Sequence, residues 1–178
     1  MQIPYLDLVT PPASEPLTLA EAKLALRVDG SVEDGYIVSL IKAARSSAEE
    51  YLRRSLVTQS WQLQFDNYVP ACVSLPKGPV QSVTFVKAIA LDFGETTVSS
   101  SNYRLNAGKD QLIFNAAPIG MIIQIKYVTG FGDSTDVPYQ IKQGMLAHIA
   151  AMYEGRDGNV GVPQVTKDLY APYKVVKI

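Results

Sequence analysis

Residues 127–144 have the order of parts found in phosphate-binding sites: an apolar run, a glycine turn and the start of a helix. A dinucleotide fingerprint needs a third glycine three residues after the second, but Thr135 stands three residues after Gly132. A nucleotide P-loop needs a lysine directly before a serine or threonine, and no lysine occurs between Lys126 and Lys142. The stretch therefore matches neither phosphate motif.

Oxygen-bearing side chains crowd the same loop at Asp133, Ser134 and Asp136. The two carboxylates would repel an anion, and the spacing lacks the glycine and the distant acidic residue of an EF-hand calcium loop. A turn accounts for the residues better, because the glycines permit it, Asp136 can cap the next helix and Pro138 can start it. We interpret residues 130–136 as a turn from a strand into a helix.

Few residues are suited to catalysis. His148 is the only histidine and lies on the apolar stripe of a predicted helix, which favours a packed or interfacial histidine over a catalytic base. Cys72 is the only cysteine and lies in an apolar strand, where we expect a small core residue. Glu49 and Glu50 are adjacent on a helix and point about 100° apart, so they form no acid–base pair. The sequence predicts no catalytic, metal or cofactor site.

Two sets of residues are better suited to contacts with other molecules. Arg45, Glu49 and Arg53 follow at intervals of four, which predicts a row of ion pairs that faces solvent, or an interface row if the helix contacts a neighbouring subunit. The C-terminal segment mixes aromatic residues with lysines, a composition that suits either base stacking or docking on another protein. The docking residues that we single out there are Tyr170, Tyr173, Lys174 and Lys177.

The composition limits the classes of function. The 178 residues are 47% apolar and 19% charged, an ordinary globular balance. Sixteen basic and 17 acidic side chains give a formal net charge of -1, so no overall field favours nucleic acid or an anionic membrane. A single cysteine allows no intramolecular disulfide, and we find no signal peptide and no membrane-spanning run. We expect a soluble protein made in a cytoplasm.

Helices are predicted near both ends of the chain. Residues 1–16 contain four prolines and predict an extended arm. Thr18 and Glu21 can form a capping box at the start of a short helix. Apolar residues at intervals of three and four predict a longer helix at about 37–54. These apolar residues are Ile37, Leu40, Ile41, Ala44, Ala48, Tyr51 and Leu52.

The middle of the chain has the alternation of β-strands. "SWQLQF" and "MIIQIKYV" alternate apolar and polar residues, and "NYRLNAGKDQLIF" predicts two strands around a turn at 106–110. About five strands with short connections indicate an antiparallel sheet or a small barrel. A further helix follows at 136–155, whereas residues 156–178 show no helical period and predict a second arm.

These elements predict an α+β fold in one domain. A small helical bundle, with helices near both chain ends, would carry an inserted antiparallel β lobe and extended terminal arms. The predicted parts are an N-terminal arm at 1–16, helices at 17–55, the β lobe at 56–130, a helix at 136–155 and a C-terminal arm at 156–178.

The chain resembles the head–tail connector, or adaptor, proteins of tailed bacteriophages, prophages and gene-transfer particles. The resemblance begins at "LTLAEAKLALRVDG", includes Glu33 and Asp34 ahead of the long helix, and continues through "YLRRSLVTQSW" into the strands. "YVTGFGDSTDVPYQIKQGMLAHIAAMYEGRD" matches the later strand, turn and helix of the same family. These motifs are structural, so they are specific as a set and weak one by one.

The resemblance implies a structural protein of the virion, without enzymatic activity or cofactor. Such proteins form a ring, twelvefold in the virion, that completes the head beneath the portal and extends the DNA channel. The implied partners are other copies of the chain, the portal protein, a further connector or tail-completion protein, and DNA that passes without sequence-specific binding. The implied location is the head–tail interface of the virion, after assembly in the host cytoplasm.

Two rival functions stay open at this stage. A small nucleic-acid-binding module of a phage or prophage is the alternative, although the balanced charge predicts weak, salt-sensitive binding. A small enzyme or ligand-binding domain is the third candidate function, and it needs a polar site that the sequence does not display. For the connector, we expect Arg45, Glu49 and Arg53 to mediate subunit contacts, and the C-terminal residues named above to dock on the portal or a neighbouring subunit.

Overall fold

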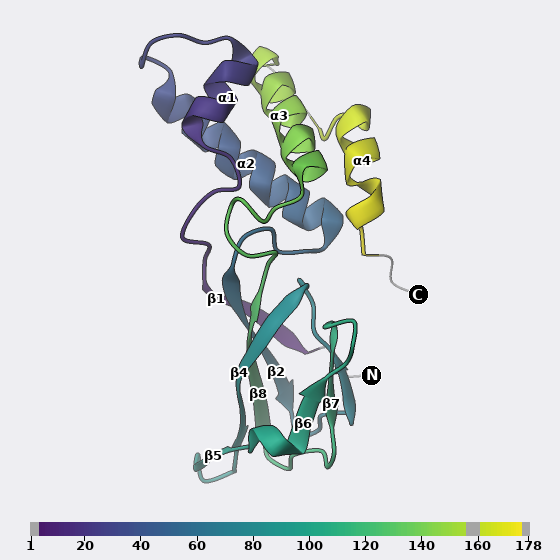
Figure 1. Ribbon diagram of the computed structural model, residues 1–178. Coiled ribbons are helices and arrows are strands. Elements are labelled where there is room, and N and C mark those ends of the chain that lie inside the picture. The colour runs from purple at the N-terminus through teal and green to yellow at the C-terminus, as the bar shows by residue number, and fades with distance from the viewer. Residues whose placement is uncertain (1–3, 156–160, 176–178) are drawn as a thin grey trace. The chain divides into compact units, whose positions relative to one another are not determined.

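The computed structural model describes residues 4–155 and 161–175, and its chain divides into two compact units (Figure 1). The first unit, Met1–Ala13 with Thr58–Phe131, contains the β-strands. The second unit, Ser14–Val57 with Gly132–Ile178, contains the α-helices. The predicted α+β class is confirmed. The antiparallel β-strands of residues 58–131 lie, in sequence, between helices of the earlier and later parts of the chain.

A five-stranded antiparallel sheet forms the larger part of the β unit, in the order β1–β2–β8–β4–β5. Its strands, in that order, are Tyr5–Thr10, Gln59–Asp66, Ile122–Thr129, Val80–Ile89 and Glu95–Thr97. A three-stranded sheet has the order β3–β7–β6, and a short 3-10 helix directly precedes β6 in the chain. These elements are β3 Cys72–Ser74, β7 Gln111–Phe114, β6 Tyr103–Leu105 and η1 Ser100–Asn102.

The two sheets share one hydrophobic core, because alternate residues of their strands face it. Leu63 pairs with Ile125 and Phe65 with Ile123, and all four side chains are buried. The alternation predicted for these strands is thereby confirmed. The prediction for Cys72 is wrong: its neighbour Val73 occupies the inward position of β3, so the pleat leaves Cys72 exposed.

The N-terminal segment is not an extended arm. Tyr5–Thr10 forms β1 and pairs antiparallel with β2, with Leu6 opposite Leu63. The prolines on both sides of this segment suggested an arm, but β2 offers a free edge, and an edge strand tolerates neighbouring prolines. Strand formation here depends on partner residues 50 to 59 positions later in the sequence, from Thr10 opposite Ser60 to Tyr5 opposite Gln64, which local composition does not reveal.

Three helices form most of the helical unit: α1 Leu19–Leu26, α2 Asp34–Leu52 and α3 Tyr139–Glu154. The capping box of α1 is confirmed, with Thr18 and Glu21 bonded in both directions, and the bonds from Thr18 hold the pKa of Glu21 below its usual value. The apolar stripe of α2 is buried as predicted, apart from the half-buried Tyr51. No helix among the described residues combines the length and apolarity that crossing a membrane requires.

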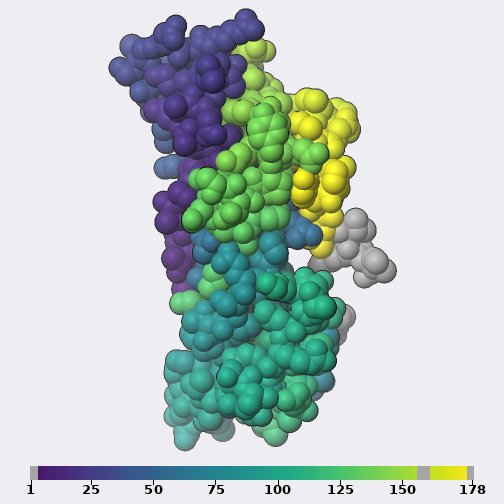
Figure 2. Space-filling view, viewed as in Figure 1, coloured from purple at the N-terminus to yellow at the C-terminus, as the bar shows by residue number. Residues whose placement is uncertain are grey.

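The C-terminal segment is not an extended arm either. Gln164–Tyr170 forms α4, and Ala171–Tyr173 adds a 3-10 turn, η2. Helix α4 packs beside α3, as Figure 2 shows for the yellow and green segments. Seven residues are too few to reveal a helical period in sequence, and so short a helix is stable only through tertiary packing.

Candidate assembly surfaces

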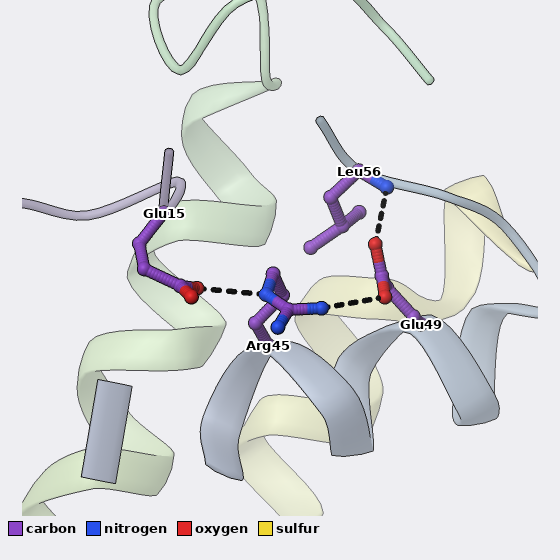
Figure 3. Close-up of polar contacts among 4 residues, drawn as sticks. All are labelled: Glu15, Arg45, Glu49 and Leu56. Carbon is purple, nitrogen blue, oxygen red and sulfur yellow. Dashed lines mark hydrogen bonds and ion pairs between the residues drawn. The ribbon is translucent and has the colours of Figure 1, made fainter. Parts of the chain in front are cut away.

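Arg45 lies at the centre of a charged cluster on α2 (Figure 3). Its Nε donates to Glu15 at 2.7 Å, and one of its terminal nitrogens donates to Glu49 at 3.0 Å. Glu49 also accepts the backbone N–H of Leu56 at 2.9 Å. The cluster thus joins three separate segments of the helical unit: the chain before α1, α2 itself and the chain after α2.

The cluster explains why a carboxylate can be buried on this helix. Glu49 is only 8% exposed, contrary to its predicted place in an exposed row. Burial by itself would lower the pKa of Arg45, but hydrogen bonds to Glu15 and the charges of both carboxylates outweigh that effect and raise it. Both charges of the Arg45–Glu49 pair are therefore directed at groups of their own chain.

Arg53 is separate from this cluster. It is the C-cap of α2, with a left-handed backbone (φ 57°), and its side chain is exposed. The intervals of four therefore predicted the Arg45–Glu49 contact correctly but not a continuous row. Glu15 was missed, because it lies in a proline-rich segment that gave no helix or strand signal. A role for Arg45, Glu49 and Arg53 in subunit contacts stays a prediction.

Tyr170 is a core residue of the helical unit. Its side chain is fully buried and its ring lies 5.9 Å from that of Tyr51, centroid to centroid. Burial raises the pKa of its hydroxyl above the usual tyrosine range. The expected docking role of Tyr170 requires an exposed side chain, and the fold removes that exposure because α4 turns the ring inward.

The residues after Tyr170 are held against the end of α2 and the start of α3. Arg54 Nε donates to the carbonyl of Tyr173 at 2.7 Å, and the hydroxyl of Tyr173 donates to Gln140. The ammonium of Lys174 lies 4.2 Å from the ring centroid of Tyr51, a cation–π distance. Lys174 is exposed and Tyr173 half-buried, so both retain surface for a partner, while Lys177 lies outside the described residues. Docking by these residues stays a prediction.

The loop before α3 has the geometry of a turn. Gly132 has φ 138°, and Asp136 accepts the backbone N–H of Asp133 at 2.8 Å. Asp136 therefore closes the turn instead of capping α3, whose N-cap is Pro138 without a side-chain bond. The interpretation as a strand-to-helix turn agrees with this geometry, while the predicted helix cap at Asp136 is wrong.

No group of three or more histidine, cysteine or acidic side chains within residues 4–155 and 161–175 is arranged to hold a metal ion. His148 is buried on α3, as its place on the apolar stripe predicted. The feature that stands out among the described residues is the buried charged cluster around Arg45. Exposed charged side chains such as Arg53 and Lys174 are compatible with the class of proteins that act through assembly.

Comparisons with known proteins identify the class more narrowly. The chain resembles three solved structures at TM-scores of 0.80 to 0.83, covering 97–98% of this chain and 96–97% of theirs, with 23–24% identity. They belong to the neck of an empty gene transfer agent (GTA) particle computed with C6 symmetry, the virion of a native GTA particle, and the neck of a native GTA particle computed with C12 symmetry. A search of the curated proteins gave no match.

A family model matches residues 16–117, which is more than half of the chain. This chain belongs to the phage gp6-like head-tail connector family. The resemblance noted in the sequence is thereby confirmed, together with its structural head–tail connecting function. The matched residues include α1, α2 and most of the β unit, from β2 to β7.

Proposed function

We propose that this protein forms a closed ring, twelvefold in the particle, between the portal and the tail side of a phage-type neck. The observation that carries the proposal is the family match over residues 16–117, joined by a fold that agrees with neck structures over nearly the full length of both chains. Symmetry of C6 and C12 in those neck structures supports a ring of copies.

The ring would extend the channel through which DNA passes. A formal net charge of -1 suits that role, because a strongly basic lumen would bind phosphates and slow their passage. The same balance gives little support to the rival nucleic-acid-binding module. The portal protein and a further connector or tail-completion protein are the partners of the proposed ring in the virion.

Two measurements test the proposal. Native mass spectrometry across a concentration series should find a closed ring of about a dozen copies, or a monomer that assembles only on a surface. In the second case, purified protein should bind tailless heads that carry the portal and should not bind heads that lack it. Failure to form a ring in solution and failure to bind portal-bearing heads would together refute the proposal.

A further inference from the structure

The turn between β4 and β5 presents two large apolar side chains to solvent. Leu91 is 80% exposed and Phe93 is 77% exposed. The turn itself is well bonded: the N–H of Phe93 donates to the carbonyl of Ala90, and the N–H of Gly94 donates to the carboxylate of Asp92 at 2.9 Å. Leu91–Phe93 therefore forms a firm, apolar projection with one carboxylate between its two large side chains.

The backbone of Phe93 makes this projection unusual. Its φ of 63° lies in the left-handed region, which glycine adopts freely and a bulky side chain adopts only at a cost. A glycine directly follows, at Gly94, yet the left-handed position holds the aromatic residue. An exposed aromatic side chain in a backbone conformation that disfavours it points to a contact made by the phenyl group.

A complementary surface lies at the end of α1. An open hollow of about 440 Å³ is lined by Lys23, Leu24, Arg27, Val28 and Asp29. The hollow is open to solvent, so it can receive side chains from outside without enclosing them. Leu24 is 82% exposed and gives the hollow apolar surface that nothing in the described parts of the chain covers.

Arg27 is the exposed positive charge at this hollow. The ammonium of Lys23 is engaged by Asp34 at 2.6 Å and by the carbonyl of Gly30. Arg27 is exposed and forms no ion pair within residues 4–155 and 161–175. Asp29 also lines the hollow, and its negative charge offsets that of Arg27. An acidic side chain of a partner is therefore attracted only if it lies close to Arg27.

We infer that the Leu91–Phe93 projection of one copy inserts into the α1 hollow of the next copy, with Asp92 facing Arg27. The inference rests on the proposed ring and identifies its subunit contact. A projection and a hollow on different surfaces make a head-to-tail contact, the kind that closes into a ring. The apolar side chains meet Leu24 and Val28, while the ion pair sets the register.

Phe93→Gly gives the first test. It removes the aromatic side chain and also removes the strain of a bulky residue in the left-handed region, because glycine adopts that conformation freely. We expect the thermal midpoint to stay the same or rise, while the concentration needed for half-maximal ring assembly increases at least tenfold. Arg27→Asp and Asp92→Arg should each impair assembly, and the double variant should recover it. Asp7→Arg, an exposed charge reversal on β1, is the control and should assemble normally.

Cross-linking tests which molecule occupies the hollow. In a Cys72→Ser background, Leu91→Cys with Leu24→Cys should yield, on oxidation, a ladder of multimers that neither single cysteine yields alone. If the wild type forms rings but the ladder is absent and Phe93→Gly assembles normally, the inferred contact is overturned and the ring stands. If Phe93→Gly rings assemble normally but fail to bind a tail-side protein, the projection contacts that protein and not the hollow of the next copy, and the inference is overturned. If the wild type neither forms rings nor binds portal-bearing heads, the proposed function itself has failed.

Discussion

The ring of Tyr170 lies directly on Gly144: a β-carbon placed at Gly144 would approach Cε1 of Tyr170 to 2.4 Å. Gly144 is buried in the middle of α3, where glycine normally weakens a helix. Its hydrogen side chain lets α4 pack close, and Thr166 on α4 donates to the carbonyl of Gly144 at 3.1 Å. This contact turns the C-terminal segment into part of the helical unit.

Gly144→Ala should therefore destabilise the helical unit despite the better helix propensity of alanine. We expect a loss of roughly 1–3 kcal/mol in the free energy of unfolding, the usual effect of overpacking a core. Gly35→Ala is the matched control, since it also lies in a helix but meets open space. That control should be neutral or stabilising by up to about 1 kcal/mol. Urea denaturation measures both, and equal effects would contradict the Tyr170 contact.

Glu49→Ala should be costly, because it leaves the buried N–H of Leu56 without its acceptor and Arg45 without one of two carboxylates. We expect a loss of about 2–4 kcal/mol. Glu49→Gln retains an acceptor and should lose less. Glu50→Ala changes the exposed neighbour and should stay within about 0.5 kcal/mol of the wild type. Chemical denaturation monitored by circular dichroism ranks the three, and a Glu50 effect as large as that of Glu49 would refute the cluster's role.

Tyr170→Phe should not destabilise the protein. The hydroxyl is buried and has no hydrogen-bond partner among the described residues, so its removal should raise the free energy of unfolding by about 1 kcal/mol. Tyr170→Ala removes the packed ring and should cost about 3–5 kcal/mol. A clear loss of stability in Tyr170→Phe would indicate that the hydroxyl is bonded in the folded protein.

Stability should fall at alkaline pH. Burial raises the pKa of Tyr127 and Tyr170 above the value of about 10 that they have when unfolded. Above that pH the unfolded chain loses tyrosine protons that the folded chain keeps, so the unfolded state is favoured as pH rises. Urea midpoints measured from pH 8 to 11 should decrease above about pH 10. Tyr170→Phe should reduce that decrease, because it removes one of the two buried hydroxyls.

Lys174→Met tests docking by the C-terminal segment. The side chain contributes a cation–π contact with Tyr51 at an exposed position, so its loss should cost at most about 1 kcal/mol of stability. If Lys174 contacts the portal, binding to portal-bearing heads should weaken severalfold. Lys42→Met, an exposed lysine on α2, serves as the control. Unchanged binding by Lys174→Met would remove this residue from the proposed docking surface.

Local signals in the sequence were sufficient for the elements that stabilise themselves. The capping box of Thr18 and Glu21, the apolar stripe of α2 and the alternation around Leu63 follow from hydrogen bonds and periodicity within a few residues. The framework motifs were also sufficient to indicate the connector family. The turn at residues 106–110 followed from its own side chains, and Asn106 accepts the N–H of Asp110 at 3.1 Å.

Only the tertiary structure decided whether residues 5–10 and 164–173 form regular elements, and which candidate contact residues are exposed. β1 exists because β2 offers it an edge, and α4 exists because Gly144 leaves room for Tyr170. Arg45 and Glu49 had the spacing of an exposed row, but Glu15 and Leu56 direct their charges inward. These outcomes depend on partners distant in the sequence, and neither composition nor periodicity carries information about which segments will meet.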